Sequence, residues 1–345
     1  MSADLAATLN SGVVIPAHPL ALDAAGRPDL GAQRALTRYY LDAGADGLAV
    51  AVHTTQFELH NDRQMLTDIW RLAAETAAER TEKPLLVAGL TGDTDTAVAE
   101  AQLAVDLGYQ AALLSPWGMS DRSEQALLQR AAAVAEVIPV IGFYLQDSVG
   151  GAPLSRDYWR RLFDIEQVVA VKTAPFDRYR TNDVIQTLLE HDRWSEVAVL
   201  TGNDDTIVYD LLTPYQRTVG GQLRQVRATG GLLGQWAVGT RATVDLLGRV
   251  KAAVEAGTVP VDLLIDAAAL IDINAAVFDV EHNFAGCVPG VNEVLRQQGL
   301  VTTADTLGTD ELSDGQSELI ATVRERYPML LDEDFIAENA QAWLS

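Results

Sequence analysis

The stretch VVAVKTA, Val168–Ala174, is an apolar run that contains one lysine, Lys172. Polar and apolar residues do not alternate in it, which is typical of a strand buried on both faces. Buried lysines are rare, and this chain has only three lysines among its 25 Lys and Arg residues. Arginine stays charged, whereas a desolvated lysine can lose its proton and act as a nucleophile. The stretch therefore indicates a Schiff-base lysine; the alternative is a strand-end lysine that reaches solvent.

Short apolar runs and helical patterns alternate on both sides of this stretch. The other predicted strands lie within residues 12–22, 47–55, 84–90, 111–115, 139–145, 198–201 and 228–234. Helices are predicted at residues 30–43, 61–82 (with Asn61 as the cap), 94–107 and 123–137, and a loop at residues 214–221. Eight strands alternating with helices favour a (β/α)₈ TIM barrel. No G-x-G-x-x-G motif follows the first strand, so a dinucleotide site is not indicated.

The strand pattern stops near residue 240. Five helices are predicted after it, at residues 242–257, 261–280, 288–299, 313–327 and 333–344. The sequence therefore predicts a barrel in residues 1–240. Residues 241–345 are predicted to hold the last barrel helix and a helical C-terminal extension.

The composition excludes several classes of protein. The chain has a net charge of −23 and 48% hydrophobic residues, so it is expected to have a sizeable core and to bind neither nucleic acid nor an anionic membrane. Its single cysteine, Cys287, excludes an intrachain disulfide and a Cys-based metal site. There is no signal-peptide pattern and no apolar run long enough to span a membrane. A cytoplasmic enzyme is the expectation.

Chemistry-bearing residues follow the predicted strands, where a barrel of this kind places its reactive groups. They are His53, Thr54 and Thr55 after the second strand, Trp117 after the fourth, Tyr144 on the fifth, Lys172 on the sixth, and Gly230 and Gly231 on the eighth. An amine, a phenol and paired hydroxyls facing one pocket predict a class I aldolase or lyase. The run Asn203-Asp204-Asp205 is interpreted as a helix cap and not as a metal site.

These residues carry a resemblance to a known family. The chain resembles the dihydrodipicolinate synthase and N-acetylneuraminate lyase family of pyruvate-dependent class I aldolases, in which the catalytic tyrosine and lysine are 28 residues apart, as Tyr144 and Lys172 are. Thr54-Thr55 match the family's paired threonines. The segments AGLTGDTDTAVAEAQLAVDLGYQAALLSPW, TGNDDTIVYDLL and ATGGLLG resemble its third and fourth, seventh and eighth strand units. The resemblance covers residues 12–299.

The resemblance implies a role for each residue. Lys172 would form an imine with pyruvate or a related 2-keto acid, and Tyr144 would transfer protons. Thr54 and Thr55 would hold the carboxylate, with Thr54 relaying protons to Tyr144. The substrate pocket would also include His53, Trp117, Gly230 and Gly231. No cofactor or metal is expected, because the protonated imine is itself the electron sink, and a homodimer or homotetramer is implied.

The chain also departs from the synthases. Where they have a second tyrosine and a substrate-binding arginine, this chain has Trp117 and Val149, and His53 replaces the glycine before the threonines. The second substrate is therefore open. The alternatives to a pyruvate lyase are a hydratase-aldolase or sugar-acid dehydratase of the same family, and a 2-keto-acid-binding barrel without turnover.

Overall fold

Eight parallel strands form one sheet in the order β1-β10-β7-β6-β5-β4-β3-β2. A parallel bridge joins Ala17, directly after β1, to Ala49 of β2, and nearly closes the sheet into a barrel. The strands are β1 (Val14–Pro16), β2 (Gly47–Val50), β3 (Leu85–Leu90), β4 (Ala111–Leu114), β5 (Val140–Leu145), β6 (Val168–Ala174), β7 (Ala198–Thr201) and β10 (Ala228–Leu233). The predicted (β/α)₈ barrel is confirmed.

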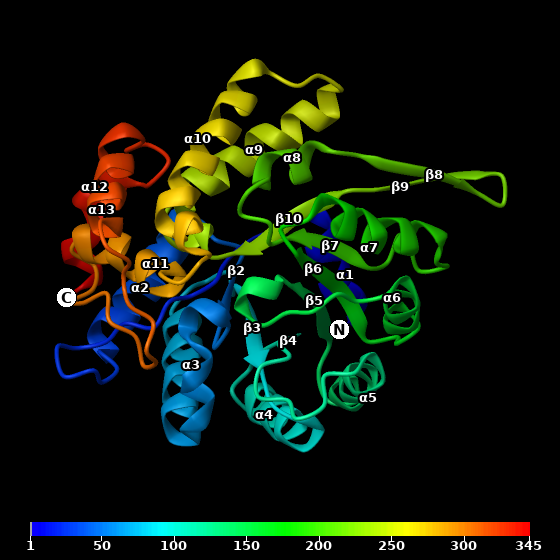
Figure 1. Ribbon diagram of the computed structural model, residues 1–345, viewed down its shortest axis with the longest axis horizontal. Helices are drawn as coiled ribbons and strands as arrows, with labels where there is room; N and C mark the ends of the chain where they lie inside the picture. Colours follow the sequence, from blue (N-terminus) through cyan, green and yellow to red (C-terminus); the bar gives the residue numbers. More distant parts are fainter. Residues whose placement is uncertain (1) are drawn as a thin grey trace. The chain divides into compact units, whose positions relative to one another are not determined.

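The computed structural model describes residues 2–345. Its first part has the helices α1 (Ser2–Ser11), α2 (Leu30–Ala43), α3 (Arg63–Ala78), α4 (Thr94–Asp106), α5 (Glu124–Ala135), α6 (Arg156–Phe163), α7 (Arg178–Glu190) and α8 (Ile207–Leu212). Figure 1 shows α4, α5, α6 and α7 arranged along the outer side of β3–β7. Every position of β5 and β6 is buried, because the barrel interior covers one face and these helices cover the other.

Two local predictions were wrong. Asn61 does not cap α3: it ends the 3₁₀ turn η2 (Phe57–Asn61), and the Asp62 carboxylate accepts hydrogen bonds from the backbone N–H groups of Gln64 and Met65. The run Asn203-Asp204-Asp205 does not cap α8 either, because the residue before that helix is Thr206. Both errors are shifts of one to three residues at a helix end, where backbone geometry decides which side chain reaches the N–H groups.

The predicted loop at residues 214–221 is also wrong, because this segment forms most of a β-hairpin. Strands β8 (Tyr215–Val219) and β9 (Gln222–Val226) pair antiparallel. Gly220 and Gly221 both have positive φ angles, 56° and 84°, as a two-residue hairpin turn of this hand requires. The hairpin is held to α7 by the ion pair of Arg217 with Glu190. Figure 1 shows it extending outward beyond α7.

The predicted C-terminal helices are present as α9 (Thr240–Ala256), α10 (Val261–Val277), α11 (Cys287–Gln297), α12 (Gln316–Arg326) and α13 (Glu333–Trp343). The buried Asp332 carboxylate connects two of them to α2. It accepts hydrogen bonds from the backbone N–H groups of Arg241 and Ala242 at the start of α9, and from the Tyr39 hydroxyl. The Trp343 ring packs 5.2 Å from the ring of Tyr39, centre to centre.

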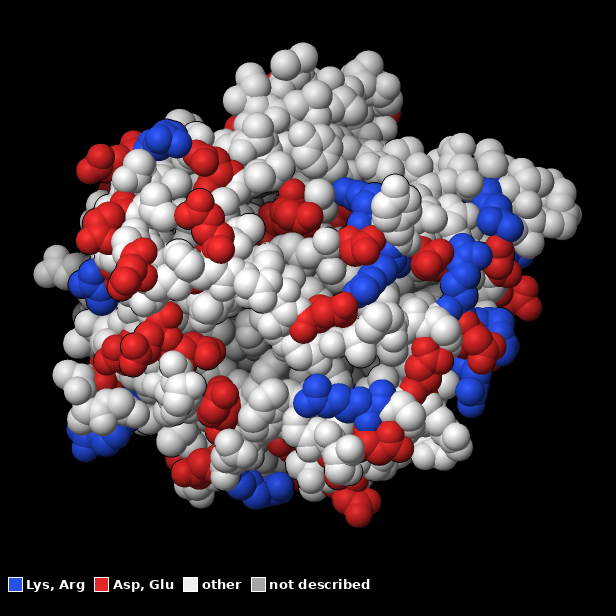
Figure 2. Space-filling view, in the orientation of Figure 1, with Lys and Arg blue, Asp and Glu red and all other residues white. Residues whose placement is uncertain are grey.

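The chain separates into two compact units. One contains the residues up to Val13 and Val87–Leu232, and the other contains Val14–Leu86 and Leu233–Ser345. The division predicted at residue 240 stays a prediction. In residues 2–345 no helix has the length and apolar character needed to cross a membrane. Figure 2 shows acidic side chains over much of the face in view, consistent with the net charge of −23.

Candidate active site

Lys172 lies on β6 with only 8% of its surface exposed. Burial lowers the pKa of its ammonium group to about 8, and the negative charge of Asp204 acts in the opposite direction. At pH 7 about one lysine in ten with such a pKa is the neutral amine, compared with roughly one in three thousand for an ordinary lysine. Burial in the strand therefore supplies the nucleophilic form that imine chemistry needs.

Gly202, directly after β7, provides the space for this side chain. A Cβ atom at Gly202 would lie 2.4 Å from Cε of Lys172 and 2.9 Å from Cβ of Ala174. Real Cβ atoms do not approach other atoms this closely, so any larger residue would displace the lysine. The requirement at this position is therefore the absence of a side chain.

Phe143 faces Lys172 from the neighbouring strand. The two residues are paired in the parallel register of β5 and β6. The Lys172 Nζ lies 4.5 Å from the centre of the Phe143 ring. An ammonium group over an aromatic face is stabilised by the electrons of the ring, but the ring has no hydroxyl to transfer a proton.

Tyr144 lies on the other face of β5. Successive side chains of a strand point to opposite faces, and Tyr144 is paired with Thr173 instead of Lys172. Its ring packs 5.1 Å from that of Trp159 on α6, centre to centre. Its hydroxyl oxygen accepts a hydrogen bond from the backbone N–H of Leu154. The structure therefore does not bring the Tyr144 phenol to Lys172, although the spacing in the sequence predicts that it would.

The threonine pair belongs to the other unit of the chain and follows β2 in the 3₁₀ turn η1 (His53–Thr55). Both hydroxyls are buried. Thr54 Oγ1 donates to the Ala17 carbonyl at 2.8 Å, and Thr55 Oγ1 donates to the His18 carbonyl at 2.6 Å. The turn is therefore fixed to the end of β1 by two side-chain hydrogen bonds.

Two residues, one on each side of this turn, have a positive φ angle, which non-glycine residues adopt at a cost. Ala51 has a φ of 62° and Gln56 a φ of 72°. Strain of this kind persists where the surroundings impose it, and it concentrates at functional sites. Gln56 therefore holds a positive φ angle without being a glycine.

The other predicted pocket residues have contacts within their own units. His53 is half-buried, with its ring 5.6 Å from that of Phe57. The Trp117 carbonyl accepts a hydrogen bond from Gly92 N–H, which joins the loops after β3 and β4. A Cβ at Gly230 would lie 2.2 Å from the Val13 carbonyl oxygen, so this glycine lets two backbones approach. Gly231 N–H donates to the same oxygen.

The loop after β7 is held by a polar network around Asp210. Its carboxylate accepts hydrogen bonds from Thr201 Oγ1 and Asn203 Nδ2, at 2.7 and 2.9 Å, and pairs with Arg178. Asp204 follows Asn203 directly and is buried. This network therefore orders the loop that carries the carboxylate acting on Lys172. In residues 2–345 no group of three or more His, Cys, Asp and Glu side chains has the arrangement of a metal site.

Comparison with known proteins decides the family. The model of the dihydrodipicolinate synthetase family matches residues 10–216, which is more than half of the chain. The chain belongs to this family. The predicted family is therefore confirmed, and it is a family of Schiff-base lyases and aldolases.

The individual relatives are distant. The 4-hydroxy-tetrahydrodipicolinate synthase of Halorhodospira halophila is 30% identical over 158 residues, which is 45% of this chain and 51% of that protein. The chain therefore matches about half the length of this curated relative.

Solved structures extend the comparison to nearly the whole chain. The prophage protein YagE from E. coli K12, solved with pyruvate, has a TM-score of 0.75 at 19% identity, over 92% of this chain and 99% of that one. The N-acetylneuraminate lyase of Fusobacterium nucleatum, also solved with pyruvate, has a TM-score of 0.70 at 14% identity, over 92% and 97%. At these identities the likeness shows the fold.

The structure adds two residues that the sequence did not single out, Phe143 and Gly202. A spacing counted along the chain cannot distinguish position 143 from position 144, because the pairing register of β5 and β6 decides which of them faces Lys172. Gly202 is part of the segment TGNDDTIVYDLL, which carries the resemblance. Its closeness to Lys172 could not be seen from that segment alone.

Proposed function

We propose that this protein is a Schiff-base-forming lyase or aldolase that acts on pyruvate or a related 2-keto acid through Lys172. The observation that carries the proposal is a buried lysine whose pKa is lowered to about 8 by burial, with space for its side chain at Gly202. The pyruvate-bound structures of two proteins with the same fold support the choice of ligand.

The reaction begins with attack of the neutral Lys172 amine on the keto carbon. A C–N bond forms, the carbonyl oxygen takes a proton, and a carbinolamine results. The nitrogen gives up one proton, the hydroxyl takes up one and departs as water, and the nitrogen lone pair forms the C=N bond of the protonated imine. This cation accepts the electron pair of the adjacent C–C or C–H bond when that bond breaks, so no further cofactor is required.

The proton transfers need a titratable group, and Phe143 cannot supply one. Asp204 is the carboxylate whose charge acts on Lys172, and we assign it the transfer of protons during carbinolamine formation and dehydration. A positioned carboxylate typically contributes a factor of about 10² to 10⁴ in such steps. This assignment replaces Tyr144, whose hydroxyl is bonded to the Leu154 backbone beneath α6.

The substrate carboxylate is assigned to the turn that contains Thr54 and Thr55, as the family resemblance implies. The support from this chain is the buried hydroxyl pair and the positive φ angles of Ala51 and Gln56 on its two sides. The remaining pocket roles of His53, Trp117, Gly230 and Gly231 stay predictions. So do a homodimer or homotetramer, which light scattering would test, and a cytoplasmic location.

A second candidate function is a 2-keto-acid-binding barrel without turnover. The observation that favours it is the phenyl ring of Phe143 facing Lys172, where a phenol is expected in an active lyase. The hydratase-aldolase and sugar-acid dehydratase alternatives share the imine with the favoured function. Retro-aldol rates on aromatic and on sugar-derived 2-keto acids would separate them.

The test is reduction of the imine with borohydride in the presence of pyruvate. One reduced pyruvate adduct is expected at Lys172, and none at the exposed Lys83 and Lys251, which serve as internal controls. Because the chain has three lysines, peptide mass mapping assigns the adduct without ambiguity. An unmodified Lys172, or equal labelling of the Lys172→Met variant, would contradict the mechanism. An adduct without product from any 2-keto acid would favour the binding function.

A further inference from the structure

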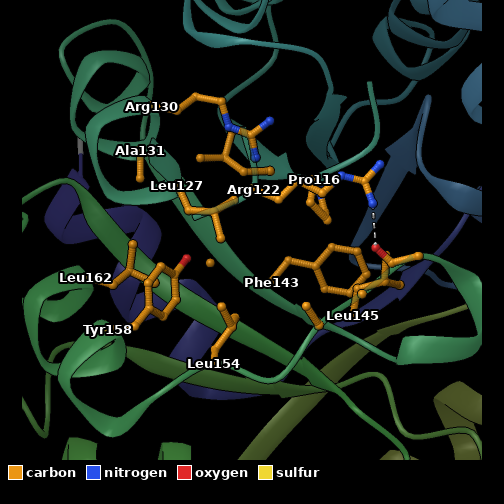
Figure 3. A pocket seen from close by; sticks show the side chains of 15 residues that line it. Pro116, Arg122, Leu127, Arg130, Ala131, Phe143, Leu145, Leu154, Tyr158 and Leu162 are labelled. Atoms are coloured by element: carbon orange, nitrogen blue, oxygen red, sulfur yellow. Dashed lines mark hydrogen bonds between the residues drawn. The ribbon is translucent and has the colours of Figure 1, made fainter. Parts of the chain in front are cut away.

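A cavity lies outside the barrel sheet, between the ends of β4 and β5 and the helices α5 and α6. Its volume is about 40 Å³, which is room for roughly three water molecules. Most of its lining is apolar, including Leu127, Ala131, Leu154 and Leu162. Figure 3 shows these side chains around the cavity. The whole cavity belongs to one unit of the chain.

Among the described residues that line the cavity, two are charged, and both are arginines. Arg130 projects from α5 and Arg122 lies in the segment before that helix, where it donates a hydrogen bond to the Gly150 carbonyl. No carboxylate is among the lining residues. The chain as a whole has a net charge of −23, but the charged groups of this lining are all cations, and such a cavity favours binding of an anion.

Arg130 is the central observation. Its side chain is 1% exposed, and within the described chain it forms no ion pair. Both of its hydrogen bonds are made by Nη1, to the carbonyls of Gly92 and Ser115, each at 2.8 Å. Its Nε is buried and has no hydrogen-bond partner in residues 2–345. A buried charge without a paired opposite charge is costly, and an anion at Nε would reduce that cost.

The guanidinium is held in place before any ligand binds. The two carbonyls that bind Nη1 lie two residues after β3 and directly after β4, so the barrel itself fixes the orientation of the Nε–H donor. Asp93 and Glu100 act on the Arg130 charge from a distance. A donor fixed in this way binds a carboxylate with little loss of side-chain entropy.

Tyr158 supplies a second donor. It lies on α6, is buried, and lines the same cavity. Burial raises the pKa of its phenol, so the hydroxyl keeps its proton at neutral pH. Figure 3 shows this hydroxyl turned toward Leu127 and the interior of the cavity. A cation and a hydroxyl donor beside an apolar wall match a carboxylate that has a short aliphatic tail.

We propose that this cavity is a binding site for a small monocarboxylate, with the carboxylate on Arg130 and Tyr158 and the tail against Leu127, Leu154 and Leu162. Inorganic phosphate or sulfate fits less well, because its additional oxygens would face apolar side chains. Neither of its two donors touches Lys172 in the described contacts, although Phe143, which packs against Lys172, also lines the cavity.

The probe is propionate, which has no ketone and cannot form an imine with Lys172. Calorimetric titration of the full chain is expected to give saturable binding of one propionate, whereas the uncharged propionamide is not expected to bind. Ala131→Leu fills the cavity and is expected to weaken propionate binding by about tenfold or more. Ala132→Leu makes the same change at an exposed neighbour and is expected to leave binding unchanged.

Two further variants keep the test decisive. Tyr158→Phe removes one hydroxyl and preserves packing, with an expected loss of affinity of about threefold to tenfold. Lys172→Met is expected to bind propionate as the wild type does. No saturable binding to the folded wild type, or equal affinity in Ala131→Leu, would overturn the proposal. Loss of binding in Lys172→Met would also overturn it, because the carboxylate would then lie beside the reactive lysine.

Discussion

Phe143 and Lys172 are paired across β5 and β6, with the Lys172 ammonium nitrogen 4.5 Å from the centre of the Phe143 ring. This pairing places a phenyl ring on the lysine's face of the sheet and turns Tyr144 toward Trp159 of α6. Phe143 therefore contacts Lys172 and Tyr144 packs against α6, and substitutions can test these two roles separately. Phe143→Tyr would place a phenol beside Lys172 and is expected to raise the rate of borohydride-trapped imine formation by about tenfold or more.

The matched change is Tyr144→Phe, which is expected to leave the trapping rate within about twofold. It would leave the half-buried Leu154 N–H without its hydroxyl acceptor, so the free energy of unfolding should fall by about 1 kcal/mol. A large loss of imine formation in Tyr144→Phe, with stability unchanged, would assign the proton transfers to Tyr144 after all.

Replacing Lys172 should stabilise the protein while abolishing the imine. Its pKa is lower in the folded chain than in the unfolded chain, so the unfolded state binds more protons between pH 8 and 10.5. Lys172→Met is therefore expected to raise the free energy of unfolding at pH 7 by roughly 3 kcal/mol. The gain should shrink as the pH rises through that range, which chemical denaturation at several pH values would measure. A gain that does not depend on pH would contradict the desolvation of Lys172.

Gly202→Ala should damage the site more than the fold. The new Cβ would fall 2.4 Å from Lys172 Cε, and the lysine side chain can move more easily than the backbone. Imine trapping is expected to fall by about a hundredfold, the size of effect that a misplaced reacting group produces. Gly248→Ala, on α9 with no atom within 4 Å of the new Cβ, is the control. It should leave trapping unchanged and stabilise the helix by up to about 1 kcal/mol.

The pH dependence of imine formation should respond to Asp204. The neutral amine forms as the pH rises through about 8, so the attack of Lys172 on pyruvate should accelerate up to that pH and then level off. The Asp204 charge raises the pKa of Lys172, so Asp204→Asn should move the midpoint to lower pH. The same variant should reduce the plateau if Asp204 transfers the protons. A midpoint that stays fixed in Asp204→Asn would show that the carboxylate does not act on the amine.

The attachment of the C-terminal helices should depend on Asp332. Its carboxylate accepts two backbone N–H groups of α9 and the Tyr39 hydroxyl. Asp332→Ala would leave these buried donors without partners and is expected to cost roughly 2 to 4 kcal/mol. Limited proteolysis should then cut first within the C-terminal helices. Asp334→Ala, at an exposed position in the first turn of α13, is the control and should have little effect.

Much of the fold could be predicted because patterns of neighbouring residues in the sequence indicate its strands and helices. The strand β6 was predicted with its observed bounds and α2 likewise, since apolar runs and helical periodicity depend on neighbours along the chain. The hairpin at 215–226 was missed because its strands are short and largely exposed. Without a buried face they have no alternation of polar and apolar residues to reveal them.

The sequence by itself determined the barrel, the family and the identity of the unusual lysine. Those features follow from composition, periodicity and short motifs. Only the tertiary structure decided what surrounds Lys172: Phe143 instead of Tyr144 on its face, Gly202 against its side chain, and Asp204 as the carboxylate that acts on it. The physical reason is the alternation of a strand. A shift of one residue in the pairing of β5 with β6 would move every side chain of β5 to the opposite face. Packing across the sheet sets this register, so it cannot be found by counting residues along the chain.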